Sequence, residues 1–368
     1  MEEWIRCNIG DVCDTISDTY RGDADKVVLV NTSDVLDGKC LNHQKSPNKD
    51  LKGQFKKTFQ RDDILYSEIR PANKRFAYID FDGTDYIAST KLMVIRHKEN
   101  IIPQFLYYII TSQAFIEELQ MLAESRSGTF PQITFTELAN QPIELPPLSE
   151  QAKIVRFLKS LDDKIEVNRR INDNLEQQAM AIFDKVFPAI ASGEDTIGSM
   201  ITPKRGKGLL SKDAVEGNVP VVAGGLEPAS YHNESNTIAP VVTISASGAN
   251  AGYVNLWHIP VWSSDSSFID ATMSSNVYFW YVMLKKRQKE IFDAQTGSAQ
   301  PHIYPKHIAE MPLGKFEQSD VEKFTEIVTP MFETRGKNLK ESERLAAVRD
   351  SLLPKLMSGE LNLDKVNV

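Results

Sequence analysis

The chain has 368 residues, of which 41% are hydrophobic, so it is long enough for two or three domains with separate cores. Its net charge of −8 argues against a protein that binds polyanions over its whole surface, although a local basic face would still suit DNA. The acidic N-terminus and the lack of a long apolar run argue against a secretory signal and a membrane span. Because the three cysteines match no zinc or redox spacing, we expect a cytoplasmic protein with free thiols.

Residues 1–148 are predicted to form a mixed α/β domain. β-rich runs bounded by Gly, Asp and Asn occur at residues 27–31, 64–66, 76–79, 86–88 and 92–96, and a helix is expected over 103–122. Three carboxylates, Asp80, Asp82 and Asp85, lie close together in this domain. An Asp-Gly step between two aromatic strands is more typical of a hairpin turn than of a calcium loop, so we expect a turn there.

Residues 149–187 are predicted to form one long helix with a coiled-coil seam. Apolar residues recur at alternating steps of four and three, and no Gly or Pro interrupts them. The seam comprises Ile154, Leu158, Leu161, Ile165, Asn168, Asn172, Leu175, Ala179, Ile182 and Val186. A single helix of this length needs a partner to stay folded in water.

The partner helix is predicted in the same chain, where residues 319–368 would form a second long helix over 319–357 and a C-terminal tail. A shift of 170 residues lays residues 131–186 over 301–356 without a gap and places Asn168 on Asn338. The second seam comprises Phe324, Val328, Met331, Asn338, Leu345 and Leu352. Pro330 and Gly336 are expected to kink or fray this helix. With the helices matched, residues 188–318 repeat the plan of residues 1–148. The alternative to this internal repeat is that the two helices are amphipathic but unrelated.

Catalytic motifs are not evident in the sequence. There is no P-loop, no GxGxxG that opens a helix after a strand, and no HExxH. His302 and His307 are expected to be structural, and no metal site is predicted. Two differing domains joined by long helices, without a cluster of catalytic residues, favour a recognition protein over an enzyme.

Basic and small polar segments are the candidates for contact with nucleic acid. Residues 39–75 contain ten Lys and Arg against four Asp and Glu, a local charge of +6. The first-domain candidates are Arg21, Lys45, Lys49, Lys52, Lys56, Lys57, Arg70, Asn73, Lys74, Arg75, Arg126, Thr129 and Gln132. The second-domain candidates are Lys204, Arg205, Lys207, Ser247, Asn250, Ser298, His302 and Tyr304. A solvated lysine-rich loop and structural turns are the plainer alternatives.

Three segments carry a resemblance to a known family. They are LPPLSEQ at residues 145–151, the run from Asn168 through Asn172 to Glu176, and RDSLLPKLMSGE at residues 349–360. With the order domain, helix, domain, helix, the chain resembles the specificity (S) subunit of a type I restriction–modification system. The resemblance implies an α+β fold with target-recognition domains at 1–148 and 188–318. The long helices, at 149–187 and within 319–368, would form an antiparallel coiled coil in a pseudo-two-fold internal repeat.

The resemblance also implies a function. Each domain would read one half of a bipartite double-stranded DNA target, and the helices would set the spacer between the halves. Two modification subunits would methylate adenine with S-adenosylmethionine, restriction subunits would use ATP and Mg where present, and this chain would be non-catalytic. The alternatives are a coiled-coil adaptor for proteins or glycans, and a metal-dependent nuclease built on Asp80, Asp82 and Asp85.

Overall fold

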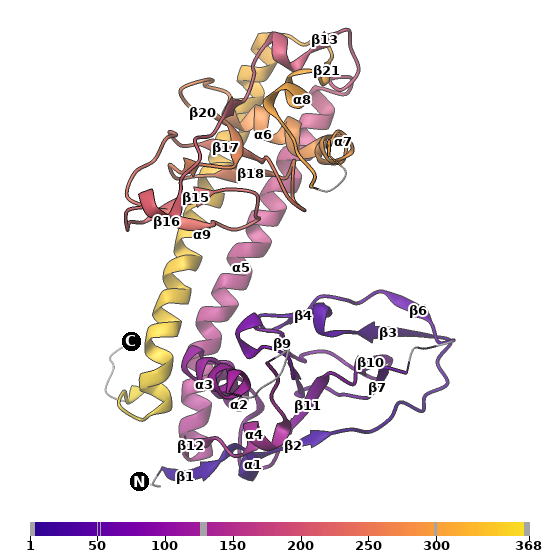
Figure 1. Ribbon diagram of the computed structural model, residues 1–368, viewed down its shortest axis with the longest axis vertical. Coiled ribbons are helices and arrows are strands. Elements are labelled where there is room, and N and C mark those ends of the chain that lie inside the picture. Colours follow the sequence, from indigo (N-terminus) through magenta and orange to yellow (C-terminus); the bar gives the residue numbers. More distant parts are fainter. Residues whose placement is uncertain (1–3, 50, 52, 126–130, 298–299, 364–368) are drawn as a thin grey trace. The chain divides into compact units, whose positions relative to one another are not determined.

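The computed structural model of the chain consists of two compact units, each of which takes in a segment of both long helices. Unit 1 comprises Met1–Ile165 and Arg344–Val368, and unit 2 comprises Glu166–Glu343 (Figure 1). The structure describes residues 4–49, 51, 53–125, 131–297 and 300–363. We call the part of unit 1 that precedes the first long helix the first domain. The part of unit 2 between the two long helices is the second domain.

The main sheet of the first domain is antiparallel and has the strand order β2-β11-β8-β9. Its strands are β2 (Cys13–Ile16), β11 (Leu92–His97), β8 (Ile64–Ser67) and β9 (Phe76–Tyr78). Side chains alternate between two cores: Tyr66 and Ile95 pack with helices α2 (Pro103–Ile110) and α3 (Gln113–Glu124), whereas Leu65 and Val94 pack with a second sheet. Burial of both faces explains why β8 and β9 are short runs of mostly apolar residues.

The second sheet of the first domain has the order β6-β3-β10-β7, with β3 and β10 parallel. Its strands are β6 (Lys45–Pro47), β3 (Lys26–Val30), β10 (Tyr86–Ser89) and β7 (Phe55–Lys57). The hairpin turn expected at Asp80–Asp85 is therefore wrong. Strands β9 and β10, on either side of this segment, belong to different sheets, because the chain crosses between the two layers there.

Shorter elements complete the first domain. Strand β1 (Ile5–Asn8) pairs with β12 (Pro142–Leu145), which leads directly into the first long helix. The helix expected over 103–122 is two helices, α2 and α3, because the Ser112 hydroxyl accepts a hydrogen bond from the backbone N–H of Phe115 and begins a new helix. The remaining elements are α1 (Ile9–Val12), η1 (Thr32–Asp34), β4 (Val35–Leu36), β5 (Lys39–Cys40), η2 (Pro71–Asn73) and α4 (Phe135–Ala139).

The second domain repeats this architecture. Its main sheet has the order β14-β20-β17-β18, formed by β14 (Lys204–Arg205), β20 (Ser266–Asp270), β17 (Val241–Ser245) and β18 (Val254–Trp257). Its second sheet has the order β16-β15-β19, formed by β16 (Ser230–His232), β15 (Val219–Val222) and β19 (Trp262–Ser263). The other elements are β13 (Asp195–Thr196), η3 (Ile197–Ser199), η4 (Ser211–Asp213), α6 (Val277–Lys286), α7 (Gln288–Asp293), α8 (Pro305–Ala309) and β21 (Pro312–Leu313).

The two domains also share their strand register, which confirms the internal repeat. Tyr66 pairs with Phe76 between β8 and β9, and Ile244 pairs with Val254 between β17 and β18. The same backbone hydrogen bond closes both hairpins: Ser67 N–H donates to Arg75 O, and Ser245 N–H donates to Tyr253 O. The number of residues between the paired positions is the same in both domains, so the two hairpins have the same register.

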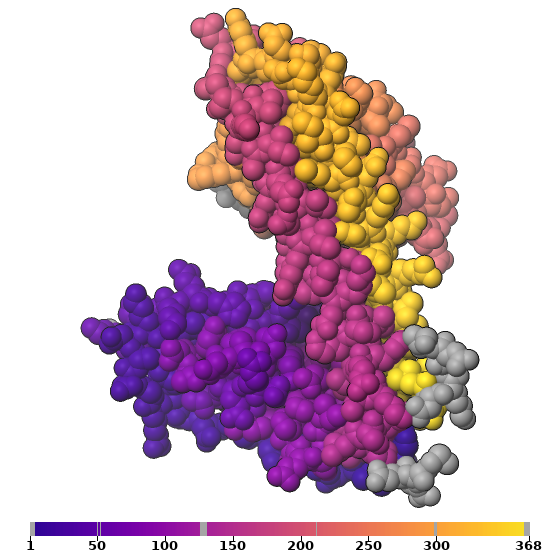
Figure 2. Space-filling model, turned by 180° about the vertical axis from the view of Figure 1, so that it is seen from behind, coloured from indigo at the N-terminus to yellow at the C-terminus, as the bar shows by residue number. Residues whose placement is uncertain are grey.

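The long helices are α5 (Leu148–Val186) and α9 (Gln318–Met357), which pack together as an antiparallel pair. Within unit 1, the apolar contacts of the pair place Ile154 and Leu158 of α5 in one core with Leu353 and Leu356 of α9. Within unit 2, the phenyl ring of Phe183 lies 5.4 Å from that of Phe324 between centroids. Figure 2 shows the two helices lying against each other within unit 2. Among the described residues, no helix is both long and apolar enough to cross a membrane.

Asparagines form a polar layer in the seam within unit 2. Asn168 Nδ2 donates to Glu341 Oε2 at 2.8 Å and to Ser342 Oγ at 3.3 Å, and Asn338 Nδ2 donates to Asn172 Oδ1 at 2.9 Å. Because Asn168 matches Asn338 in the repeat and Asn172 matches Ser342, the same contact is made twice across the pair. Asn168 is fully buried, so a shift in register would leave its Nδ2 group without these partners.

The seam follows the predicted positions over most of its length. Ile154, Leu158, Asn168, Phe324 and Val328 are buried. Leu161, Ile165, Leu175, Ile182, Met331, Asn338, Leu345 and Leu352 are partly buried. Near its C-terminal end α5 departs from the pattern, because Val186 is exposed and Phe183 and Phe187 are buried instead. A straight helix drifts by about 20° per heptad from a 3.5-residue repeat, which moves the seam by one position.

Helix α9 continues without interruption through Pro330 and Gly336. The expectation that these residues fray the helix is therefore wrong. The side chain of Pro330 is exposed, and the neighbouring Val328 and Phe332 are both buried in the core of unit 2. The packing of Val328 and Phe332 stabilises the helix at this point, although Pro330 has no N–H to donate to the helix.

Replacing Asn168 by Ala is expected to destabilise the protein by about 1–3 kcal/mol, because Glu341 and Ser342 lose a buried hydrogen-bond partner. Chemical unfolding followed by circular dichroism measures this change. Arg170→Ala, on an exposed side of the same helix, is the control and should change stability by less than about 0.5 kcal/mol. Equal effects of the two substitutions would contradict the role given to the asparagine layer.

Candidate nucleic-acid interface

Two of the predicted contact segments of the first domain lie side by side. The connection between β8 and β9 is joined to residues 131–133 by hydrogen bonds from Arg70 N–H to Pro131 O at 3.0 Å and from Ile133 N–H to Glu68 O at 2.9 Å. Gln132 forms an antiparallel bridge with Ile69 between them. The structure thus brings Arg70, Asn73 and Lys74 together with Gln132, although these residues are far apart in the sequence.

The second domain has the same arrangement. Gly248 N–H donates to Pro301 O at 3.1 Å, Ile303 N–H donates to Ala246 O at 2.9 Å, and Ser247 bridges His302. We call residues 67–75 with 131–133 in the first domain, and 245–253 with 300–303 in the second, the paired loops. The paired loops hold the predicted residues Ser247, Asn250 and His302.

Both paired loops depend on left-handed backbone conformations at matching positions. Arg70 and Lys74 have φ of 46° and 51°, and Gly248 and Gly252 have φ of 84° and 87° in the second domain. A side chain at such a φ costs about 1–2 kcal/mol. The first domain therefore keeps two basic residues at positions where glycine would be more stable, which is common where a residue has a functional role.

Polar side chains gather at the paired loop of the second domain. Asp265 accepts a hydrogen bond from Arg205 Nη2 at 2.5 Å and another from the hydroxyl of Ser247. His302 Nδ1 lies 2.8 Å from Gln300 O, and its ring stacks on the exposed Tyr304 at 5.9 Å between centroids. This cluster presents donors and acceptors of the kind that contact base edges and phosphates.

The lysines of the first domain are placed differently from the paired loop. Lys45 and Lys56 lie on β6 and β7, the two outer strands of the second sheet, and Lys49 is exposed just after β6. Lys45 Nζ forms an ion pair with Asp85 at 3.0 Å. Lys57 Nζ donates to the backbone carbonyl of Leu92, and burial lowers its pKa. The local excess of positive charge in the sequence is therefore partly offset in the fold.

Other predicted contact residues are distributed over the surface. Arg75 is engaged internally, because its guanidinium donates to the carbonyls of Ser33 and Val35. Arg21 is exposed in a loop, and Lys204 is exposed on β14. The backbone carbonyl of Lys207 accepts a hydrogen bond from the Trp262 indole, and its side chain is exposed. Lys52, Arg126, Thr129 and Ser298 lie outside the described residues.

The three carboxylates considered for a nuclease have separate surroundings. Asp82 accepts hydrogen bonds from the hydroxyl and the backbone N–H of Thr84, which lower its pKa. Asp85 pairs with Lys45, and the backbone carbonyl of Asp80 accepts from Arg61. Within the described part of the chain, no three His, Cys, Asp or Glu side chains are placed to hold a metal ion.

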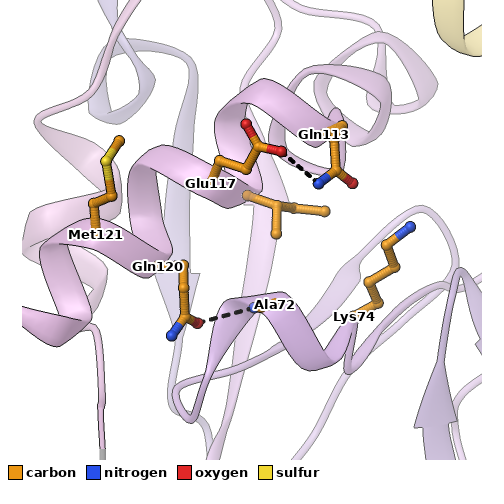
Figure 3. Close-up of a pocket in the computed structure, with 7 residues that line it drawn as sticks. Ala72, Lys74, Gln113, Glu117, Gln120 and Met121 are labelled. Atoms are coloured by element: carbon orange, nitrogen blue, oxygen red, sulfur yellow. Dashed lines mark hydrogen bonds between the residues drawn. The ribbon is translucent and has the colours of Figure 1, made fainter. Parts of the chain in front are cut away.

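A hollow of about 350 Å³ borders the paired loop of the first domain (Figure 3). It lies between η2 and α3, and its lining residues are Ala72, Lys74, Gln113, Ile116, Glu117, Gln120 and Met121. Gln120 Oε1 accepts a hydrogen bond from Ala72 N–H at 3.1 Å and so attaches the loop to α3. Sequence reasoning missed Gln113 and Gln120, whose only local signal is their four-residue spacing from Glu117 and Glu124.

Comparison with known proteins agrees with this architecture. Residues 1–177 match the model of the type I restriction modification DNA specificity domain. The chain is 45% identical over 189 residues to the type I restriction enzyme HindI specificity subunit of Haemophilus influenzae. Residues 1–177 are thus similar to the type I restriction–modification DNA specificity domain. The resemblance noted in the sequence is thereby confirmed.

The family matches extend beyond the first domain. The HindI match covers 51% of this chain and 41% of that subunit, so it spans less than half of that relative. The MjaIX specificity subunit of Methanocaldococcus jannaschii is 24% identical over 310 residues, covering 73% of this chain and 71% of that one. The fold resembles the crystal structure of the type I S subunit from M. genitalium, with a TM-score of 0.54, 20% identity and coverage of 96% of both chains.

A pair of glycine substitutions tests the geometry of the second paired loop. Gly248→Ala and Gly252→Ala should each cost about 1–2 kcal/mol of stability for the left-handed backbone. Gly252→Ala should cost more, because its Cβ would lie 2.8 Å from Ile291, whereas the space around Gly248 is open. Thermal unfolding of the two variants gives the comparison, and a larger loss for Gly248→Ala would contradict the loop geometry described.

Proposed function

We propose that this chain is the DNA-recognition subunit of a type I restriction–modification complex, and that each domain reads one half of a bipartite target. The observation that carries the proposal is the construction of the same paired loops twice, on sheets with the same order and register. The match of residues 1–177 supports DNA as the ligand, because the matched family is a DNA specificity domain.

The two paired loops would read different half-sites, because they share a backbone frame but not their side chains. The first offers Arg70, Asn73, Lys74 and Gln132, and the second offers small and hydrogen-bonding groups such as Ser247, Asn250 and His302. Guanidinium and amide groups suit bidentate contact with guanine and adenine, and each such pair contributes about 1–3 kcal/mol of discrimination. Exposed lysines on the outer strands would contact phosphates and position the duplex.

The long helices would set the spacer between the halves. Two half-sites on one side of a duplex lie about one helical turn apart, roughly 34–36 Å. Helix α5 has 39 residues without a break, so it spans about 58 Å. The buried asparagine layer holds the register of the helix pair, which supports a role as a rigid spacer.

Catalysis would belong to other subunits in this proposal. Two modification subunits would bind S-adenosylmethionine and methylate adenine, and restriction subunits, where present, would use ATP and Mg. This chain would direct both activities without a catalytic residue of its own. The similarity to specificity domains and specificity subunits favours this assignment over a coiled-coil adaptor for proteins or glycans.

Exchange of the first domain tests the modular reading of DNA. Replacing residues 1–148 by the same segment of another family member should change one half of the methylated sequence and leave the other half unaltered. Mapping of methylated adenines in cells that carry the assembled complex measures this outcome. A change in both halves would contradict the proposal.

Lengthening the helix pair tests the spacer. Insertion of seven residues in α5 near Ile165 and in α9 near Leu345 adds about 10 Å to the pair. The methylated target should then keep both halves and gain about three base pairs between them, at 3.4 Å per base pair. An unchanged spacer would remove the helix pair as its determinant, and insertion of the same segment in the exposed loop near Gly208 is the control.

A further inference from the structure

Four polar side chains connect the second domain to both long helices within unit 2. Tyr281 of α6 donates from its hydroxyl to Glu176 Oε1 of α5 at 2.8 Å. Arg335 of α9 lies with Nε 3.5 Å from Glu176 Oε2, and its Nη1 donates to His258 Nε2 at 3.0 Å. We call Tyr281, Glu176, Arg335 and His258 the second joint.

The second joint is largely shielded from water. Tyr281 is 1% exposed, and the side chains of Glu176 and Arg335 are 19% and 15% exposed. Burial and the charge of Arg335 lower the pKa of His258 to about 4, so its imidazole is neutral at physiological pH and its Nε2 accepts from Arg335. Burial raises the pKa of Tyr281 well above its usual value, so the phenol keeps the proton that it donates to Glu176. Hydrogen bonds to charged groups are shorter and stronger than neutral ones, and breaking such a bond in a buried site is costly.

The second joint explains two residues that do not fit the seam of α9. Arg335 is placed at the seam because it neutralises the carboxylate of Glu176. Gly336 lies directly under the imidazole ring, since a Cβ there would be 2.8 Å from Cγ of His258. Glycine within a helix costs about 1 kcal/mol relative to alanine. Helix α9 therefore gives up intrinsic stability at this point to let His258 reach Arg335.

Unit 1 contains a corresponding first joint. Tyr108 of α2 donates to Asp162 Oδ2 of α5 at 2.6 Å, and Arg349 Nη1 of α9 donates to Asp162 Oδ1 at 2.7 Å. Tyr108 and Tyr281 occupy matching places in α2 and α6, but the two carboxylates do not match in the repeat. The residue that matches Asp162 is Phe332, which packs edge-on against Tyr281 at 5.6 Å. Each unit therefore contains a tyrosine, a carboxylate and an arginine in contact. The tyrosines match in the repeat, whereas the carboxylates do not.

We propose that Glu176 and Asp162 are positioning residues, which fix the angle at which each domain is held on the helix pair and so the spacing at which its half-site is read. This inference rests on the proposed function in DNA recognition. Hydrogen bonds and ion pairs to a tyrosine and an arginine from two other elements restrain each carboxylate, and through it the orientation of the domain on its helices. One extra base pair moves a half-site by about 3.4 Å and turns it by about 35°. A stiff joint therefore makes recognition selective for one spacer length.

The test uses the full chain assembled with its modification subunit and compares Tyr281→Phe with Tyr278→Phe. Both substitutions remove one hydroxyl from α6, but only Tyr281 donates to Glu176. Initial methylation rates are measured on duplexes with the native spacer and with one base pair more or fewer. Tyr281→Phe should lower the ratio of the native rate to the altered-spacer rates by about tenfold, which corresponds to 1.4 kcal/mol. Tyr278→Phe should leave this ratio equal to that of the wild-type complex.

Gly336→Ala provides a second variant that tests the joint from the other side. It favours the helix but displaces His258 from Arg335, so it should reduce spacer selectivity without loss of helical structure. If either variant lowers the unfolding temperature while the rate ratio stays unchanged, the joint is structural only and the proposal is overturned. If the wild-type complex methylates no bipartite target, the proposed function is overturned instead. The proposed role of the joints in DNA reading then falls with it.

Discussion

The antiparallel pairing of α5 and α9 is the interaction on which the rest of the structure depends. Most of the stability of a helix in a protein comes from the packing of its apolar face, and each domain builds part of its core on these helices. The apolar seam provides most of the stabilisation, and the buried asparagines select one register among those that an apolar seam would allow. A displaced register would move Glu176 from Arg335 and Asp162 from Arg349, so the helix pair and the joints depend on each other.

The repeat keeps the framework and varies the surface. Strand order, hairpin register and the hydrogen bonds of the paired loops recur in both domains, because these features are set by backbone geometry and by alternating burial. The side chains that project from this framework differ, with arginine and lysine in one left-handed position each and glycine in their counterparts. A shared backbone with different side chains fits the proposal that the two domains read different half-sites.

Charge acts locally in this chain and not through its total. The net charge is −8, yet individual cations lie at the paired loops and on the outer strands of the first domain. Several predicted DNA contacts are engaged within the protein, such as Arg75 at the end of η1 and Lys57 at the backbone of Leu92. Lys45 is paired with Asp85, which reduces the positive field at the edge of that sheet. The paired loops are therefore the better candidates for base contact, and the remaining exposed lysines for phosphate contact.

The long helices, the repeat and the seam asparagines could be predicted from the sequence, because period and spacing are local properties of the chain. The packing of the fold was needed to show that Gln132 lies against Ile69, that His302 lies against Ser247, and that β9 and β10 enter different sheets. Packing also explains Arg335 and Gly336 in α9, since their partner His258 is distant in sequence. Contacts between residues far apart in the chain leave no periodic trace, so they become visible only when the layers are packed.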